Sequence, residues 1–199
     1  TSAAPPGRRG RIHSIHRVLF AFIVAAVIGT ERLAHLDWYE GDALLLKLLR
    51  LSSWPVRKVF SAALETINDG GITTLRNILT NLGLRAIETE SSAVLDFDST
   101  AVVSFGGQSG ALFGYCGKGR NRRRHYPLVA SVAKGRTVVN VKYRDGSAID
   151  AEEAIAFFDD SVKRVRERKP GVDLKIRADA GFWSAKMARW FLDQKIHFA

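Results

Sequence analysis

Two aspartates stand at the ends of apolar, strand-like runs that lie far apart in the sequence. Asp98 follows Val94-Leu95-Asp96-Phe97, and Asp179 follows Leu174-Lys175-Ile176-Arg177-Ala178. If the two strand ends lie side by side, their carboxylates can hold a hard cation such as Mg²⁺ or Mn²⁺ against a phosphodiester. Side chains alternate along a strand, so Asp96 shares a face with Asp98 and is a reserve metal ligand. This pattern predicts metal-dependent chemistry on phosphate esters.

A dense cationic segment lies between the two acidic strings. It contains Lys118, Arg120, Arg122, Arg123 and Arg124, and we interpret it as a basic hairpin loop that contacts phosphate. A merely solvated loop is the alternative. Gln108 stands in the glycine-rich stretch before it and either approaches DNA or supports a turn. No helix is expected after that stretch, so it is not a nucleotide-binding phosphate loop.

The composition agrees with a polyanionic partner. The chain has 199 residues and a net charge of +10, which attracts nucleic acid or an anionic membrane. An apolar content of 46% is sufficient for a real core and excludes disorder for most of the chain. Cys116 is the only cysteine, which excludes an internal disulfide and a cysteine-based zinc site and indicates a cytoplasmic protein.

The N-terminal region raises the question of a targeting segment. Residues 1–12 are rich in Pro, Gly and Arg and predict a flexible basic arm. The apolar run over residues 18–28 follows several arginines, as in a signal peptide, but it is shorter than the roughly 20 residues that a membrane span needs. We favour a buried helix over a secretory signal, and we expect no membrane partner.

Residues 13–90 have a helical pattern and predict a small N-terminal domain that is a candidate for DNA binding. Helices are expected over residues 56–67, started by Ser53 and Pro55, and over residues 72–82, with the stretch 68–71 ending the first of them. A helix-turn-helix around Trp54 could read DNA, but short helices packing on one another give the same pattern, and we favour packing.

Residues 91–199 predict an α/β domain. Strand-like runs cover residues 94–105, 126–133 and 137–143, and the last two are joined by a glycine-containing turn as a hairpin. A helix over 148–168, a strand over 173–178, a helix over 184–194 and a strand from residue 196 follow. Right-handed crossovers would bring these later strands in parallel beside the first, so that Asp98 and Asp179 meet.

Four strings in this order resemble the DDE transposases of bacterial insertion sequences: Asp98-Ser99-Thr100, the glycine-rich stretch 106–115, Tyr126-Pro127-Leu128 and Arg177-Ala178-Asp179-Ala180-Gly181-Phe182. They most resemble the branch whose first acidic motif precedes a Gly-Gln-Gly segment and whose second is Arg-Ala-Asp-x-Gly-Phe. The match runs from about residue 95 to the C-terminus.

The resemblance implies a ribonuclease-H-like catalytic core with an Asp-Asp-Glu triad that binds two Mg²⁺ or Mn²⁺ ions. By position, Asp98 matches the first catalytic aspartate and Asp179 the second. The reaction implied is hydrolysis and strand transfer at transposon ends, with transposon and target DNA as partners and with a homodimer on DNA as a compatible assembly. It also implies a bacterial, nucleoid-associated protein. The family's glutamate lies on a later helix, so we expect that the domain continues past Ala199 and that this stretch alone is inactive.

Structural roles compete with these assignments. Asp96 or Asp98 could be a solvated carboxylate on an edge strand, and Asp179 could cap the helix near Ser184 or pair with Arg177. A basic DNA-binding protein without catalysis, whose carboxylates are structural, is therefore the alternative function. Dependence of DNA cleavage on a divalent ion distinguishes the two.

Overall fold

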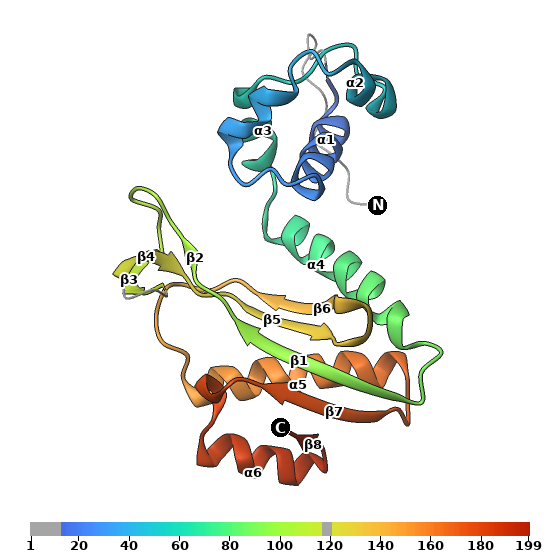
Figure 1. Cartoon of the computed structure of the whole chain (residues 1–199), viewed down its shortest axis with the longest axis vertical. Coiled ribbons are helices and arrows are strands. Elements are labelled where there is room, and N and C mark those ends of the chain that lie inside the picture. The colour runs from blue at the N-terminus through green and yellow to red at the C-terminus, as the bar shows by residue number, and fades with distance from the viewer. Residues whose placement is uncertain (1–12, 117–120) are drawn as a thin grey trace. The chain divides into compact units, whose positions relative to one another are not determined.

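The computed structural model describes residues 13–116 and 121–199, and the expected basic arm over residues 1–12 lies outside them. Contacts divide the chain into two compact units, Thr1–Ile72 and Thr73–Ala199, with the division in the first turn of helix α4. Figure 1 shows the helices of the first unit and the sheets of the second. The separation of a helical domain over 13–90 from a catalytic core over 91–199 remains a prediction about function.

The first unit is helical because apolar side chains recur at helical spacing. Its core contains Val18, Ala21 and Phe60, and Trp54 packs between Tyr39 and Phe60 with ring centroids 5.5 and 5.6 Å away. Trp54 is thus part of the core, as the packing interpretation expects. The elements are α1 (Ile15–Val27), η1 (Leu33–Tyr39), α2 (Ala43–Leu49) and α3 (Arg57–Leu64).

The apolar run over residues 18–28 forms most of α1, whose inner face is buried in this core. In the described part of the chain, no helix is long and apolar enough to cross a membrane. The helix expected over residues 56–67 is α3, which starts at Arg57 but ends at Leu64. The capping role expected for Ser53 is wrong: the N-cap is Val56, and the Ser53 hydroxyl instead lies 3.3 Å from His13 Nε2.

Helix α4 (Asp69–Leu84) begins where the sequence was expected to end a helix. The side chain of Asn68 accepts a hydrogen bond of 2.9 Å from the Gly71 N–H, which caps α4 and keeps both glycines inside it. The helix ends at Leu84, close to the end expected near residue 82. Gly83 in its last turn lets the helix approach the backbone of Val138 closely. The short turn η2 (Arg85–Ile87) follows.

The second unit is built on a five-stranded sheet in the order β6-β5-β1-β7-β8. β5 and β6 pair antiparallel with their neighbours, while β7 and β8 pair parallel, so the central strand β1 has one partner of each kind. This order confirms the expected ribonuclease-H-like mixed sheet. Its strands are β1 (Ser92–Ser99), β5 (Leu128–Val132), β6 (Thr137–Lys142), β7 (Asp173–Ala178) and β8 (His197–Phe198).

One face of this sheet is covered by α5 (Ala151–Arg168) and α6 (Ala185–Gln194). Phe97 of β1 stacks on Phe158 of α5 with ring centroids 3.7 Å apart, and Phe158 also contacts Phe191 of α6. Leu95 and Phe97 point to this core, so alternation turns Asp96 and Asp98 to the opposite face. Asp150 caps α5 and Ser184 caps α6, each by accepting a bond from a first-turn N–H.

A second, three-stranded sheet in the order β2-β4-β3 was not expected. The predicted strand over residues 94–105 is wrong in its second half, because β1 ends at Ser99 and a short β2 (Val102–Val103) follows. The expected basic loop is also wrong in part: Asn121–His125 form strand β4, which pairs with β3 (Leu112–Tyr115). Lys118 and Arg120 lie outside the described residues.

Candidate active site at the ends of two parallel strands

Asp98 and Asp179 lie at neighbouring strand ends. Phe97 and Ala178 are the last paired residues of the parallel β1–β7 ladder, and the two aspartates directly follow them. Strands in a sheet are about 5 Å apart, so the two Cα atoms are near neighbours on the same edge. The two aspartates, which are 81 positions apart in the sequence, are therefore brought together. β1 is the central strand, which excludes the edge-strand interpretation for Asp98.

Each of the two carboxylates has one oxygen held by the backbone. Asp98 Oδ1 accepts from the Ser99 N–H at 2.7 Å, and Asp179 Oδ1 accepts from the Gly181 N–H at 2.8 Å. Both residues are exposed, and neither forms an ion pair with any cation in the described ranges. The second oxygen of each carboxylate is thus available, which is the arrangement that a metal ligand needs.

Asp179 also starts the turn η4 (Ala180–Phe182), for which it is the N-cap. A Cβ atom at Gly181 would lie 2.9 Å from Asp179 Oδ1, closer than a side chain tolerates, so the glycine makes room for the carboxylate. The two structural roles considered for Asp179, capping the helix near Ser184 and pairing with Arg177, are both wrong. Helix α6 is capped by Ser184, and Arg177 pairs with another aspartate.

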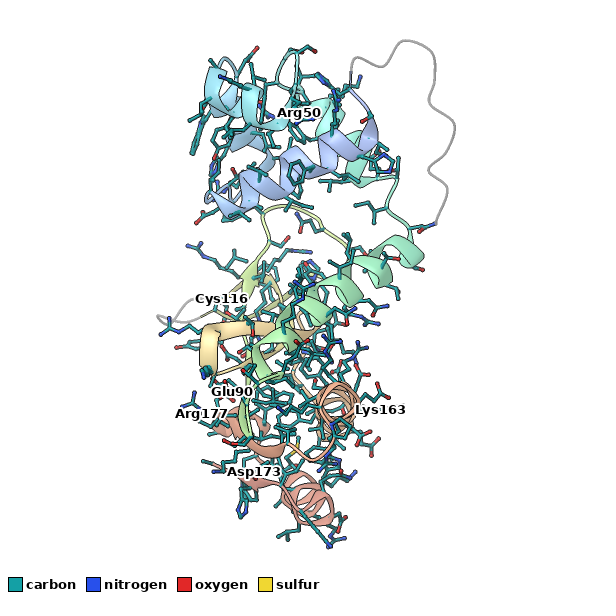
Figure 2. The ribbon with its side chains drawn as sticks, turned by 90° about the vertical axis from the view of Figure 1, so that its right-hand side faces the viewer. Arg50, Glu90, Cys116, Lys163, Asp173 and Arg177 are labelled. Atoms are coloured by element: carbon teal, nitrogen blue, oxygen red, sulfur yellow. The ribbon has the colours of Figure 1, made fainter. Side chains whose placement is uncertain are left out.

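That other aspartate is Asp96, the reserve ligand. Arg177 Nε and Nη2 donate to Asp96 Oδ1 and Oδ2 at 2.6 and 2.7 Å, a bidentate pair across the β1–β7 register. This hydrogen bonding to Asp96 raises the pKa of Arg177 above its ordinary value. Arg177 is near the end of β7 and Asp173 is its first residue; both are labelled in Figure 2. Both oxygens of Asp96 are occupied, so Asp96 is less available to a metal than Asp98.

The described residues contain no group of three metal-ligating side chains. The donor set at the strand ends is two carboxylates, which suits Mg²⁺ or Mn²⁺ because such ions take one or two carboxylates and complete their shell with water and substrate phosphate. The residues therefore fit a hard divalent ion. Two carboxylates do not form a closed cage, so without a substrate they would hold such an ion only weakly.

The three-stranded sheet of β2, β4 and β3, here called the small sheet, begins with β2, which follows the Asp98 strand β1 along the chain. Arg122 and Arg123 of β4 are exposed, whereas Arg124 is half-buried, bonds the Tyr115 carbonyl and lies 4.3 Å from the ring centroid of Tyr126. Gln108 Oε1 accepts a bond of 2.8 Å from the Ser104 hydroxyl, which supports the turn interpretation for its side chain. Sequence reasoning missed the position of Arg124, because the pairing of β4 with β3 is not visible in an arginine run.

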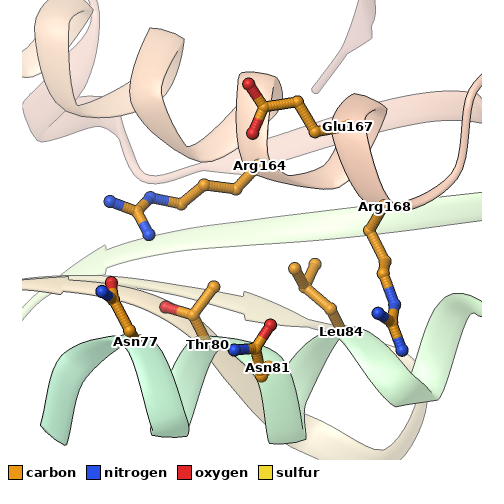
Figure 3. A pocket seen from close by; sticks show the side chains of 7 residues that line it. All are labelled: Asn77, Thr80, Asn81, Leu84, Arg164, Glu167 and Arg168. Atoms are coloured by element: carbon orange, nitrogen blue, oxygen red, sulfur yellow. The ribbon is translucent and has the colours of Figure 1, made fainter. Parts of the chain in front are cut away.

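A polar cavity of about 350 Å³ lies elsewhere, between α4 and α5 (Figure 3). Its arginines are paired within the unit: Arg164 binds Asp160 at 2.9 Å, and Arg168 binds Glu88. No residue of β1 or β7 lines it, so this cavity is separate from the carboxylates. Its lining residues are Asn77, Thr80, Asn81, Leu84, Arg164, Glu167 and Arg168.

The fold and the paired aspartates define a ribonuclease-H-like domain with acidic residues at the ends of its first and fourth core strands. Comparison with protein families identifies the class of protein: residues 7–199 match the family described as "Transposase DDE domain group 1". The chain belongs to this family of DDE transposase domains. No curated protein sequence matches it.

Solved transposase structures are similar at low sequence identity. The Mos1 transposase catalytic domain with raltegravir and Mn has a TM-score of 0.40 at 8% identity over 62% of this chain and 57% of that one. The Drosophila P element strand transfer complex has a TM-score of 0.42 at 12% identity over 96% and 38% of the two chains. The piggyBac synaptic complex with hairpin DNA gives 0.46 at 16% identity over 98% and 44%. This chain thus spans a little over half of the Mos1 domain's length.

Proposed function

We propose that this domain belongs to a transposase that cleaves and joins DNA at the ends of its element. Asp98 and Asp179 are the catalytic and metal-binding carboxylates, and the phosphodiester of a transposon end is the substrate. The observation that carries the proposal is their position after the last pair of the β1–β7 ladder, each with one oxygen fixed by a backbone N–H and without an ion pair in the described ranges.

The residues of this chain have three tasks in such a reaction. Asp98, fixed on the central strand, and Asp179, fixed by its turn, are oriented by backbone bonds before any ligand arrives, which lowers the cost of assembling the site. The Arg177–Asp96 pair beside them limits the negative charge on that face of the sheet. Arg122 and Arg123 on β4 bind backbone phosphates of the DNA and keep it against the sheet edge.

A divalent ion, Mg²⁺ or Mn²⁺, held by Asp98 and Asp179 would supply an activated water or DNA 3′-hydroxyl and charge stabilisation at phosphorus. Two ions are expected in the complete site. The described residues bring two carboxylates to it, so we propose that residues 1–199 alone bind metal weakly and do not cleave DNA. A bacterial insertion sequence as the source of the gene, a homodimer on DNA and DNA binding by residues 13–90 are parts of the same proposal.

Metal binding by the 199-residue chain is the direct test. Calorimetric titration with Mn²⁺ should show binding that Asp98→Asn and Asp179→Asn each weaken at least tenfold. Asp173→Asn is the matched control, because Asp173 is an exposed carboxylate at the other end of the same strand. Equal effects of all three substitutions would mean that Mn²⁺ binds the acidic surface without a site, and would refute the proposal.

Cleavage is tested in the longest open reading frame that contains this chain. On plasmid DNA with the element's own flanks, nicking should require Mg²⁺ or Mn²⁺ and should disappear in Asp98→Asn and Asp179→Asn while DNA binding is retained. Undiminished nicking in either variant would contradict the catalytic assignment.

A further inference from the structure

The small sheet exposes aromatic rings beside arginines on the surface that follows the Asp98 strand. On β3, Phe113 and Tyr115 are 72% and 61% exposed, which is unusual for large rings. They are two residues apart and share a face with Arg123, the cross-strand partner of Phe113, whose guanidinium carbon lies 5.3 Å from the Phe113 ring centroid. We name Phe113, Tyr115 and Arg123 the aromatic face.

The strand behind the aromatic face is held in place by Arg124. Its guanidinium crosses the other side of β3, bonds the Tyr115 carbonyl and stacks on Tyr126. A Cβ atom at Gly114 would lie 2.6 Å from Arg124 Nε, so the glycine between the two rings lets the guanidinium pack closely against the strand. These contacts support the strand that carries the two rings, which reduces the ordering cost of binding.

The charge of the small sheet points to a nucleic-acid ligand. Its strands contain Arg122, Arg123 and Arg124 and no acidic residue: their sequences are VV, LFGY and NRRRH. Exposed rings interleaved with arginines are the surface on which bases stack while phosphates are neutralised. A second copy of this chain, with its net charge of +10, would be repelled by such a surface.

The spacing of the rings favours unpaired nucleotides over a duplex. Residues two apart on a strand are separated by about 6.7 Å, twice the 3.4 Å between successive bases of a duplex strand. Bases inside a duplex are also covered on both faces by their neighbours, so a ring can stack only on a base that has left the stack. Two rings at this separation can stack on two successive bases only if the bases are unstacked from each other.

The location connects this surface to the carboxylates. β1 pairs with β5 up to Ser99–Leu128, and β2 pairs with β4 from Val102–His125, so the small sheet continues the same two-stranded ribbon beyond Asp98. Resting on the proposed function, we propose that the aromatic face binds unpaired nucleotides of DNA next to the reacting phosphodiester. Phe113 and Tyr115 stack on the bases, and Arg123 binds the phosphate between them.

The test uses the full chain and two DNA probes with 2-aminopurine at two adjacent positions. One probe is a duplex, and the other leaves the two 2-aminopurines unpaired opposite a gap in the complementary strand. The wild-type chain should bind the gapped probe more tightly and change its fluorescence through stacking. Phe113→Leu and Tyr115→Leu should each weaken gapped-probe binding about tenfold and abolish the fluorescence change, while duplex binding changes less than twofold.

Matched variants separate stacking from folding. Tyr115→Phe keeps a ring and should behave as wild type, and Leu192→Ala removes an equally exposed apolar side chain, 72% exposed, from α6 without effect. Circular dichroism checks that each variant keeps its fold. Equal weakening of both probes by Phe113→Leu, or no weakening of either, would overturn the proposal. It would also be overturned if light scattering showed a wild-type dimer that Phe113→Leu converts to a monomer.

The outcome is independent of catalysis. Asp98→Asn should leave the fluorescence change intact, because Asp98 is not part of the aromatic face. If cleavage proves absent while stacking is observed, the proposed function fails and the nucleotide site stands. If cleavage is observed and the rings have no effect, the nucleotide site alone fails.

Discussion

Replacing Arg177 with alanine should strengthen metal binding, although Arg177 is next to the candidate site and belongs to its sequence motif. Arg177 neutralises Asp96 through two bonds of 2.6 and 2.7 Å and makes no ion pair with Asp98 or Asp179. In Arg177→Ala the pair loses its positive member, so the face of the sheet that carries Asp98 gains one uncompensated negative charge. A divalent cation responds to that charge.

The size of the effect follows from the strand geometry. Asp96 and Asp98 are two residues apart on β1, which places their side chains about 7 Å from each other on one face. Coulomb's law in a water-like dielectric then gives about eightfold tighter binding of a divalent ion at low salt. Screening at an ionic strength of 0.1 M reduces this to about threefold.

Calorimetric titration with Mn²⁺ at two salt concentrations measures this. Asp96→Asn should have the opposite effect, since it leaves the Arg177 charge unopposed, and Lys175→Ala, one step further along the same face of β7, should change affinity less than either. Weaker or unchanged binding in Arg177→Ala would refute the electrostatic reasoning, and weaker binding would show that Arg177 positions the site directly.

Three further predictions concern the core that supports the site. Burial alone would raise the pKa of Glu153, but bonds from Arg144 and Lys142 keep it below the ordinary value of 4.5, so this stabilisation is present above that pH and lost on acidification; urea unfolding between pH 3 and 6 should therefore show a weaker pH dependence in Glu153→Gln. Gly83→Ala should cost about 1–3 kcal/mol in urea unfolding, because the new methyl group would meet the Val138 carbonyl; an unchanged midpoint would contradict the close approach of α4 to β6. Phe158→Ala should cost about 3–5 kcal/mol, since Phe158 is fully buried among four aromatic rings; a loss below 1 kcal/mol would mean that the aromatic cluster repacks.

The main sheet could be predicted from the sequence because its strands and helices differ clearly in period. Leu95 and Phe97 alternate with polar residues, and the charged ends of α5 match a helix dipole. The types of these elements, and from their order the meeting of Asp98 with Asp179, could therefore be predicted. The pairing of Arg177 with Asp96 could not be predicted from the sequence. It depends on the register between β1 and β7, which places Arg177 opposite Asp96, and no local pattern contains that register.

The errors have local causes. Gly70 and Gly71 favoured a break, but the Asn68 side chain caps the helix at that point, and one hydrogen bond offsets the poor helix propensity of two glycines. The small sheet was missed because Asn121–His125 lack an apolar alternation. Their strand exists through pairing with β2 and β3 on either side, and such pairing is a tertiary effect that sequence period does not report.

Pro127 stands where the ribbon passes from one sheet to the other. It has no N–H to give, and across from it the Thr100 N–H reaches the Pro127 carbonyl at 3.4 Å, the long end of the hydrogen-bonding range. The joint between the sheets is thus weakly bonded, and its amide protons should exchange with solvent sooner than those at Phe97, which lies within the paired part of β1. A force on the small sheet would therefore bend the chain at this joint, two residues from Asp98, before it disturbed the ring cluster around Phe158.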